Sequence, residues 1–162
     1  MAWSASGIFR EFVAGPMFQS SGTGWTGLDS DTVKLANYGN TGTPDKDAAV
    51  GLTGYAAATS AWVTGNEVVD ATNWPAGGLA LASKTFTTPS SGVIMFDAAD
   101  RAGTGNVTLS AVFGGLVYDD TITGGTVADQ GACFLYYGGS QSVTAGTFTV
   151  VFSANGIMRI TV

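Results

Sequence analysis

The chain has 162 residues and a net charge of −6; only 11% of its residues are charged, whereas 45% are hydrophobic. A chain of this length buries a sizeable core without a metal or a disulfide, and we expect one domain over residues 1–162. Its six basic residues stand singly along the chain, so no basic stripe is present to bind nucleic-acid phosphates or an anionic membrane surface. We therefore expect neither nucleic acid nor membrane as a partner.

The N-terminal segment 4–14 is predicted as a short helix, because four large apolar residues recur in it at helical spacing and Gly15-Pro16 follows. These four residues are Ile8, Phe9, Phe12 and Val13. They either pack on the protein's own core or form an arm that reaches a neighbouring subunit. Residues 1–27 are thus predicted as an N-terminal helix or arm followed by a loop.

The rest of the chain is predicted as short strands, with turn residues every ten or so positions and a short helix at 55–62. Gly114-Gly115 predicts a bulge or bend, and Asn155-Gly156 predicts a hairpin between the last two strands. The predicted strands are 31–38, 79–87, 92–97, 106–117, 132–137, 147–153 and 157–162. This series predicts a mainly β domain, an antiparallel β-sandwich or a jelly-roll-like barrel.

Cysteine content and the N-terminal residues bear on the cellular compartment. Cys133 is the only cysteine, so no intrachain disulfide can form, and its apolar neighbours indicate a buried, unreactive thiol. Residues 1–4 lack the charged and apolar regions of a signal peptide, and no apolar stretch approaches the roughly 20 residues of a membrane span. We expect synthesis in the cytoplasm.

The sequence holds no histidine, which excludes the catalytic arrangements that use one as a base and removes the commonest transition-metal ligand. With one cysteine in addition, a zinc site is close to excluded. None of the three lysines follows a glycine, so a phosphate-binding P-loop is absent. We expect a protein that is not an enzyme and that carries no cofactor.

Four aspartates stand where predicted strands meet loops: Asp97, Asp100, Asp119 and Asp120. Two of them could form an acid/base pair for glycoside cleavage, or several could bind calcium through hard oxygen ligands. Aspartates also organise turns by accepting hydrogen bonds from nearby backbone N–H groups, and this interpretation is favoured at strand ends.

Five aromatic residues could form a platform on which sugar rings stack: Trp25, Trp62, Trp74, Tyr136 and Tyr137. Tryptophan and tyrosine also fill cores and protein interfaces, where their large amphipathic rings are enriched. Packing or an interface is the favoured interpretation.

Four Gly- and Thr-rich stretches cover most of the chain from Val33 onward. They are VKLANYGNTGTPDKDA (33–48), WVTGNEVVDATNWPAGGLAL (62–81), PSSGVIMFDAADRAGTGNVTLSAVFGGLVYDD (89–120) and ADQGACFLYYGGSQSVTAGTFTVVFSANGIMRITV (128–162). Together they resemble a group of small virion structural proteins of tailed bacteriophages that infect actinobacteria. The first thirty residues carry little of this resemblance.

The resemblance implies a capsid decoration, or minor capsid, protein that coats the outside of the head and cements neighbouring major capsid subunits. Its implied partners are the major capsid protein and copies of itself, with a trimer as the expected oligomer. The segment Ile8–Val13 and the loop around Trp74 are the candidate contact regions. The alternative is a tail or fibre protein that binds host surface carbohydrate through exposed tryptophan and tyrosine.

Overall fold

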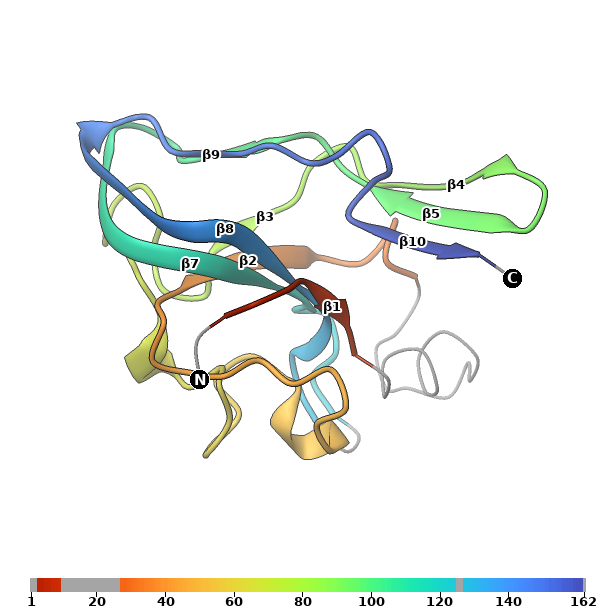
Figure 1. Ribbon diagram of the computed structural model, residues 1–162, viewed down its shortest axis with the longest axis horizontal. Helices are drawn as coiled ribbons and strands as arrows, with labels where there is room; N and C mark the ends of the chain where they lie inside the picture. Colours follow the sequence, from red (N-terminus) through yellow and green to blue (C-terminus); the bar gives the residue numbers. More distant parts are fainter. Residues whose placement is uncertain (1–2, 10–26, 125–126, 162) are drawn as a thin grey trace.

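Two long antiparallel strands, β7 (Val107–Asp119) and β8 (Gln130–Gly146), form the centre of the fold. The computed structural model describes residues 3–9, 27–124 and 127–161 (Figure 1). In this part of the chain the structure is mainly β, and its sheets are antiparallel, as predicted and in keeping with a β-sandwich.

The main sheet has five strands in the order β1-β8-β7-β2-β3. Strand β1 is Gly7–Ile8, β2 is Val33–Tyr38 and β3 is Leu79–Ala80. Five of the six residues of β2 are buried, because β7 and β3 flank this strand and both of its faces are covered.

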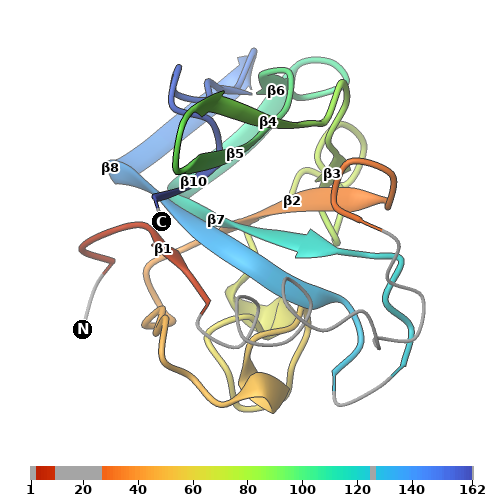
Figure 2. The same cartoon turned by 90° about the vertical axis from the view of Figure 1, so that its right-hand side faces the viewer.

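A second sheet, which we call the flap, has three strands in the order β10-β5-β4. Strand β4 is Thr85–Ser90, β5 is Val93–Asp97 and β10 is Met158–Thr161. The flap lies at one end of the molecule and contains the last described residues of the chain (Figures 1 and 2). Strands β6 (Arg101–Ala102) and β9 (Thr149–Val150) pair with each other. In the chain, β6 lies between β5 of the flap and β7 of the main sheet, and β9 lies between β8 and β10.

Glycines and bulges shape the β7–β8 pair. A side chain at Gly114 would meet the backbone of Leu135 and the ring of Trp3, so only glycine fits where these layers approach. The predicted irregularity is present beside it: β7 advances from Gly114 to Val112 while β8 advances from Tyr136 to Gln141. The surplus residues of β8 bulge out of the ladder at this point.

The predicted N-terminal helix is wrong for the described residues 3–9, and the remainder of the prediction, 10–14, lies outside them. Gly7 and Ile8 form strand β1, which pairs with Phe134 and Cys133 at the edge of β8. The backbone hydrogen bonds of an open sheet edge replace those of a helix, and Phe9 N–H extends the pairing by donating to the carbonyl of Ala132.

The predicted helix at 55–62 is also wrong. The chain there makes turns, and the only helical turns among the described residues are the 3-10 segments Val50–Leu52 and Thr64–Asn66. Ala56 and Thr59 have positive φ angles, which a right-handed helix does not allow. The alanines of this segment permit a helix, but the tertiary fold requires reversals of direction.

The predicted turn at Asn155-Gly156 is present, but the predicted hairpin around it is not. Gly156 has a φ of 76° and donates its N–H to Ser153 O over 2.8 Å. The strands on either side pair elsewhere: β9 with β6, and β10 with β5. Pairing with β5 places Met158 beside Phe96, and both side chains are buried.

The core is rich in aromatic rings that meet edge to face. Trp62 is central: its ring lies 5.8 Å from Trp3, 5.8 Å from Phe9 and 5.2 Å from Tyr38, at interplanar angles of 73°, 89° and 84°. Phe134 of β8 joins the same cluster. Edge-to-face pairs add about 0.5–1.5 kcal/mol each beyond the area that they bury, so this cluster fastens the N-terminal segment to the sheet.

Gly78 provides a test of the close approach between β3 and β2. Its φ is +70°, and an added Cβ would meet the backbone of Leu35 and Ala36. We expect Gly78→Ala to lower the free energy of unfolding by more than about 3 kcal/mol, measured by urea denaturation. In Gly51→Ala the added Cβ meets nothing within 4 Å, and a change within about 0.5 kcal/mol is expected. Equal effects of the two substitutions would contradict the close approach.

Candidate functional site

The described residues contain no grouping of the side chains that usually bind metals. Among residues 3–9, 27–124 and 127–161, no three histidine, cysteine, aspartate or glutamate side chains are grouped as ligands of a metal ion would be. Cys133 is buried, and burial raises the pKa of its thiol far above the usual range, as expected for an unreactive cysteine. The helical turns of this same part of the chain are too short to cross a membrane.

The four aspartates considered as calcium ligands or an acid/base pair are divided between different elements. Asp119 is the last residue of β7, and Asp120, which follows it, forms an ion pair of 2.8 Å with Lys34. Asp100 precedes β6 and accepts a hydrogen bond of 2.8 Å from Phe152 N–H, and Asp97 ends β5. These contacts favour the interpretation that the aspartates organise chain ends and turns.

Asp119 has the most perturbed carboxyl group of the four. It is fully buried, and its Oδ1 accepts a hydrogen bond of 2.9 Å from Thr121 N–H. Burial raises the pKa of Asp119 from the usual 3.8 to about 7, the hydrogen bond from Thr121 lowers it, and the carboxyl group of Asp31 raises it. The protonated form can donate to Asp31, so this pair joins the segment before β2 to the end of β7.

This environment predicts a pH dependence of stability. The unfolded chain has the ordinary pKa, so the folded state binds the proton more tightly, and stability falls as the pH rises from about 4 through about 7. Asp119→Asn remains neutral, keeps an acceptor for Thr121 N–H and offers a donor to Asp31. We expect this variant to be more stable than the wild type by about 1–2 kcal/mol at pH 8 and similar to it at pH 4, measured by urea denaturation.

Asp120→Asn is the matched control. It removes a partly exposed ion pair with Lys34, and we expect a loss of about 0–1 kcal/mol that does not reverse between pH 4 and pH 8. Parallel pH profiles for the wild type and Asp119→Asn would contradict the raised pKa.

The flap is the first candidate interaction surface. All six residues of its edge strand β4 are exposed, and β5 is the only strand with which β4 pairs among the described elements. The register aligns Phe86, Phe96 and Met158 across the sheet; the last two are buried, whereas Phe86 remains 44% exposed. The flap therefore combines an open backbone edge with an apolar face that is only partly covered.

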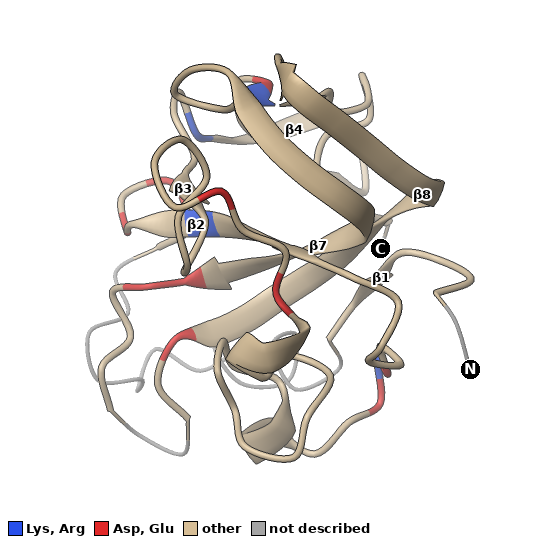
Figure 3. Ribbon diagram, turned by 90° about the vertical axis from the view of Figure 1, so that its left-hand side faces the viewer, with Lys and Arg blue, Asp and Glu red and all other residues tan. Residues whose placement is uncertain are grey.

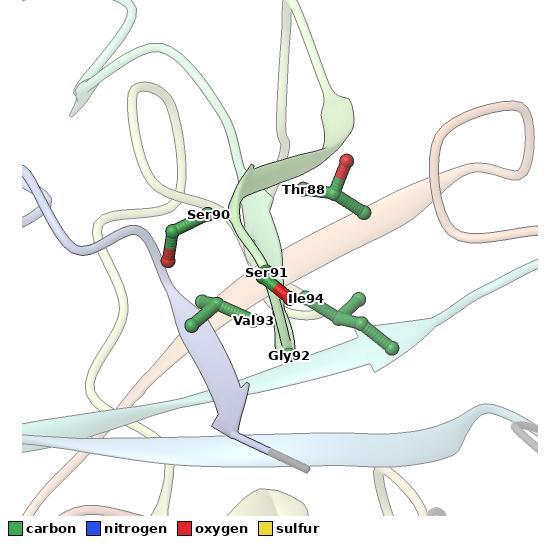
Figure 4. A pocket seen from close by; sticks show the side chains of 6 residues that line it. All are labelled: Thr88, Ser90, Ser91, Gly92, Val93 and Ile94. Atoms are coloured by element: carbon green, nitrogen blue, oxygen red, sulfur yellow. The ribbon is translucent and has the colours of Figure 1, made fainter.

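The tip of the flap is hollowed. A depression of about 360 Å³ lies where β4 turns into β5, lined by Thr88, Ser90, Ser91, Gly92, Val93 and Ile94 (Figure 4). In Figure 4 the side chains of Thr88 and Ile94 project to one side of the hairpin, and those of Ser90 and Val93 to the other. None of these residues is charged, so the tip presents hydroxyl, methyl and backbone groups only.

The second candidate surface, which we call the β8–β9 groove, lies between the last part of β8 and the returning chain at β9. Its volume is about 580 Å³. The residues that line it are Tyr136, Tyr137, Gln141, Ser142, Val143, Thr147, Phe148, Thr149, Val150 and Val151. The groove begins at the bulge of β8, where Gly138 and Gly139 have positive φ angles and change the direction in which side chains point.

Charged groups are sparse around both surfaces. Figure 3 shows that the ribbons of β8 and most of β7 carry no Lys, Arg, Asp or Glu. No charged residue occurs between Gln130 and Met158 in the sequence, and all of the groove belongs to this stretch. Such surfaces have few ions to desolvate when a partner covers them.

The structure separates the predicted contact residues. Phe9 and Trp74 are fully buried, and Ile8 is half-buried on β1. Phe12 and Val13 lie outside the described residues. An interface that used the rings of Phe9 or Trp74 would require their segments to leave the core.

The predicted sugar platform is divided in the same way. Trp62 and Trp74 are buried, Trp25 lies outside the described residues, and Tyr136 and Tyr137 line the groove. Sequence reasoning did not identify Phe86 as an exposed residue. The threonines and the proline that follow it are typical of an exposed edge strand and could have indicated its position. It also missed Phe148, which lines the groove, because this residue was predicted only as part of the strand 147–153.

Comparison of the chain with protein-family models, with curated proteins and with solved structures finds no match.

Proposed function

We propose that this protein is a capsid decoration protein of a tailed bacteriophage, which binds the outside of the assembled head and cements neighbouring major capsid subunits. Two features support the proposal: the resemblance of four stretches that span most of the chain, and the low content of charged residues. The net charge of −6 suits a protein that does not contact packaged DNA.

The observation that carries the proposal is the flap. An exposed edge strand offers unpaired backbone N–H and C=O groups to an added strand, and natural proteins usually protect such an edge with charge. In β4 no residue is charged, and Pro89 is the only residue that opposes pairing. We propose that an extended segment of a major capsid subunit adds to this edge and covers Phe86.

Binding of this kind stabilises the shell by mass action. A ligand that binds the assembled shell, and not free subunits, shifts the equilibrium toward the shell by an amount that grows with the logarithm of its concentration. Self-association, with a trimer as the expected form, would place several flaps at one symmetry axis. A rigid core suits such a role, because an ordered surface loses little entropy when it binds.

The proposal predicts saturable binding to expanded capsids that lack this protein. Purified wild-type protein is mixed with such capsids, the particles are pelleted, and bound protein is located by electron microscopy. We expect ordered density at symmetry-related sites and a loss of affinity of at least about tenfold for Phe86→Ser. Thr87→Lys places a charge on the same edge and is expected to weaken binding as well.

Val69→Ser is the matched control. Val69 is 43% exposed, close to the 44% of Phe86, but it lies outside the flap, so binding should not change. Capsids that stay bare with the wild-type protein would refute the head assignment. If antibodies then label tails, the protein belongs to the alternative class of tail or fibre proteins.

A further inference from the structure

We infer that the β8–β9 groove binds the ring of a neutral pyranose sugar, either free or as part of a surface polysaccharide. This inference does not depend on the proposed attachment to capsids, since the groove and the flap share no residues. Its volume of about 580 Å³ falls within the range of about 300–1,000 Å³ in which small-molecule sites lie.

The floor of the groove is aromatic and held in place from beneath. Phe148 meets the fully buried Trp74 edge to face, at 5.6 Å and 84°, and Tyr137 lies 6.3 Å from Phe148. The hydroxyl of Tyr137 donates a hydrogen bond of 3.0 Å to Oδ1 of Asn37 on β2. Rings fixed in this way lose little freedom when a ligand stacks on them.

Neutral hydrogen-bonding groups surround this floor. Gln141 donates to the carbonyl of Tyr137 over 3.2 Å, which orients its amide and leaves its carbonyl oxygen as an acceptor. Ser142 Oγ accepts from Ala111 N–H over 2.9 Å and keeps its own proton to donate. The hydroxyl-bearing residues Thr147 and Thr149 also line the groove. Amides and hydroxyls beside aromatic faces complement a ring that has apolar C–H faces and equatorial hydroxyls.

The lack of charged residues in the groove limits the class of ligand that it can bind. No lysine, arginine, aspartate or glutamate lines it, so it offers no partner to a phosphate, a carboxylate or an amine. A flat apolar ligand would leave Gln141 and Ser142 without hydrogen-bond partners at the bound surface, which lowers its affinity. A neutral sugar satisfies both the rings and the polar groups.

The bulge of β8 makes this arrangement possible. Tyr136 and Tyr137 line the groove just before this bulge, and Gln141 just after it donates back to the carbonyl of Tyr137. Gly138 and Gly139, with φ angles of +79° and +145°, follow directly and allow the strand to change course. Bulges recur beside binding sites for this reason.

The inference is tested by NMR titration of the ¹⁵N-labelled full chain with glucose, galactose, mannose, maltose and lactose. We expect saturable shifts confined to residues 136–151 for at least one of these sugars, with a dissociation constant on the order of 1 mM. Tyr136→Ala and Gln141→Ala should each weaken that binding about tenfold, whereas Tyr136→Phe, which retains the ring, should bind within about threefold of the wild type. Thermal unfolding of each variant checks that the fold is kept.

Two further arms identify the ligand. Glucuronate, the carboxylate counterpart of glucose, should bind no better than glucose; preferential binding of the anion would overturn the assignment to neutral sugars. Co-sedimentation with an insoluble neutral polysaccharide separates a surface glycan from a free sugar: sedimentation abolished by Gln141→Ala supports a glycan, and shifts with soluble sugars alone support a free sugar.

Phe86→Ser connects this test to that of the proposed function. This variant should keep full sugar binding, and Gln141→Ala should keep full capsid binding, because the two substitutions lie on separate surfaces. The inference fails if no sugar shifts residues 136–151 saturably and no polysaccharide retains the protein. The decoration proposal is unaffected by that outcome, and the sugar site is unaffected if capsids stay bare.

Discussion

The pairing of β7 with β8 is the constraint on which the rest of the structure depends. These two strands are the longest of the described elements, and β8 also pairs with β1 while β7 also pairs with β2. Their hydrogen bonds therefore fix the positions of β1 and β2, two segments from the first forty residues of the chain. The ladder is irregular at several positions, and the groove forms beside the largest of these irregularities, where β8 advances from Tyr136 to Gln141.

Buried polar contacts join the irregular segment between β2 and β3 to this sheet. Glu67 accepts hydrogen bonds of 2.9 Å from the hydroxyl of Tyr55 and from Gly77 N–H. Burial raises the pKa of Glu67, and the two hydrogen bonds lower it. Tyr118 of β7 donates to Gly77 O over 2.7 Å and stacks on Tyr55 at 4.9 Å. A long loop that lacks strands is thereby held by satisfied polar groups and by ring contacts, as buried backbone requires.

The two candidate surfaces both lack charged residues, but they offer different groups to a partner. The flap leaves backbone groups unpaired at its edge, which suits an extended partner. The groove places side-chain amides and hydroxyls beside rings, which suits a small polar ligand. Because no residue belongs to both, a substitution on one surface is expected to leave the other unchanged. A particle-bound protein with this arrangement could hold a shell and present a sugar site at the same time.

Sequence alone determined the class of the fold and much of its local structure. Short runs of strand-forming residues between turn residues predicted β2 and β5, Gly114-Gly115 predicted the irregularity in β7, and the turn at Asn155-Gly156 is where the dipeptide indicated. The lack of histidine likewise removed the catalytic arrangements that depend on it. These inferences depend on short-range sterics and on residue chemistry, and short segments of the sequence determine both.

Only the tertiary structure decided which strands pair and which aromatic residues are exposed. The turn at Gly156 is local, but β10 pairs with β5 because that edge buries Met158 against Phe96, a contact between residues more than sixty positions apart. In the same way, Ile8 joins a strand because β8 offers an open edge. The two candidate surfaces follow from this long-range pairing, because the pairing of the other strands determines which edge remains exposed and where a groove forms.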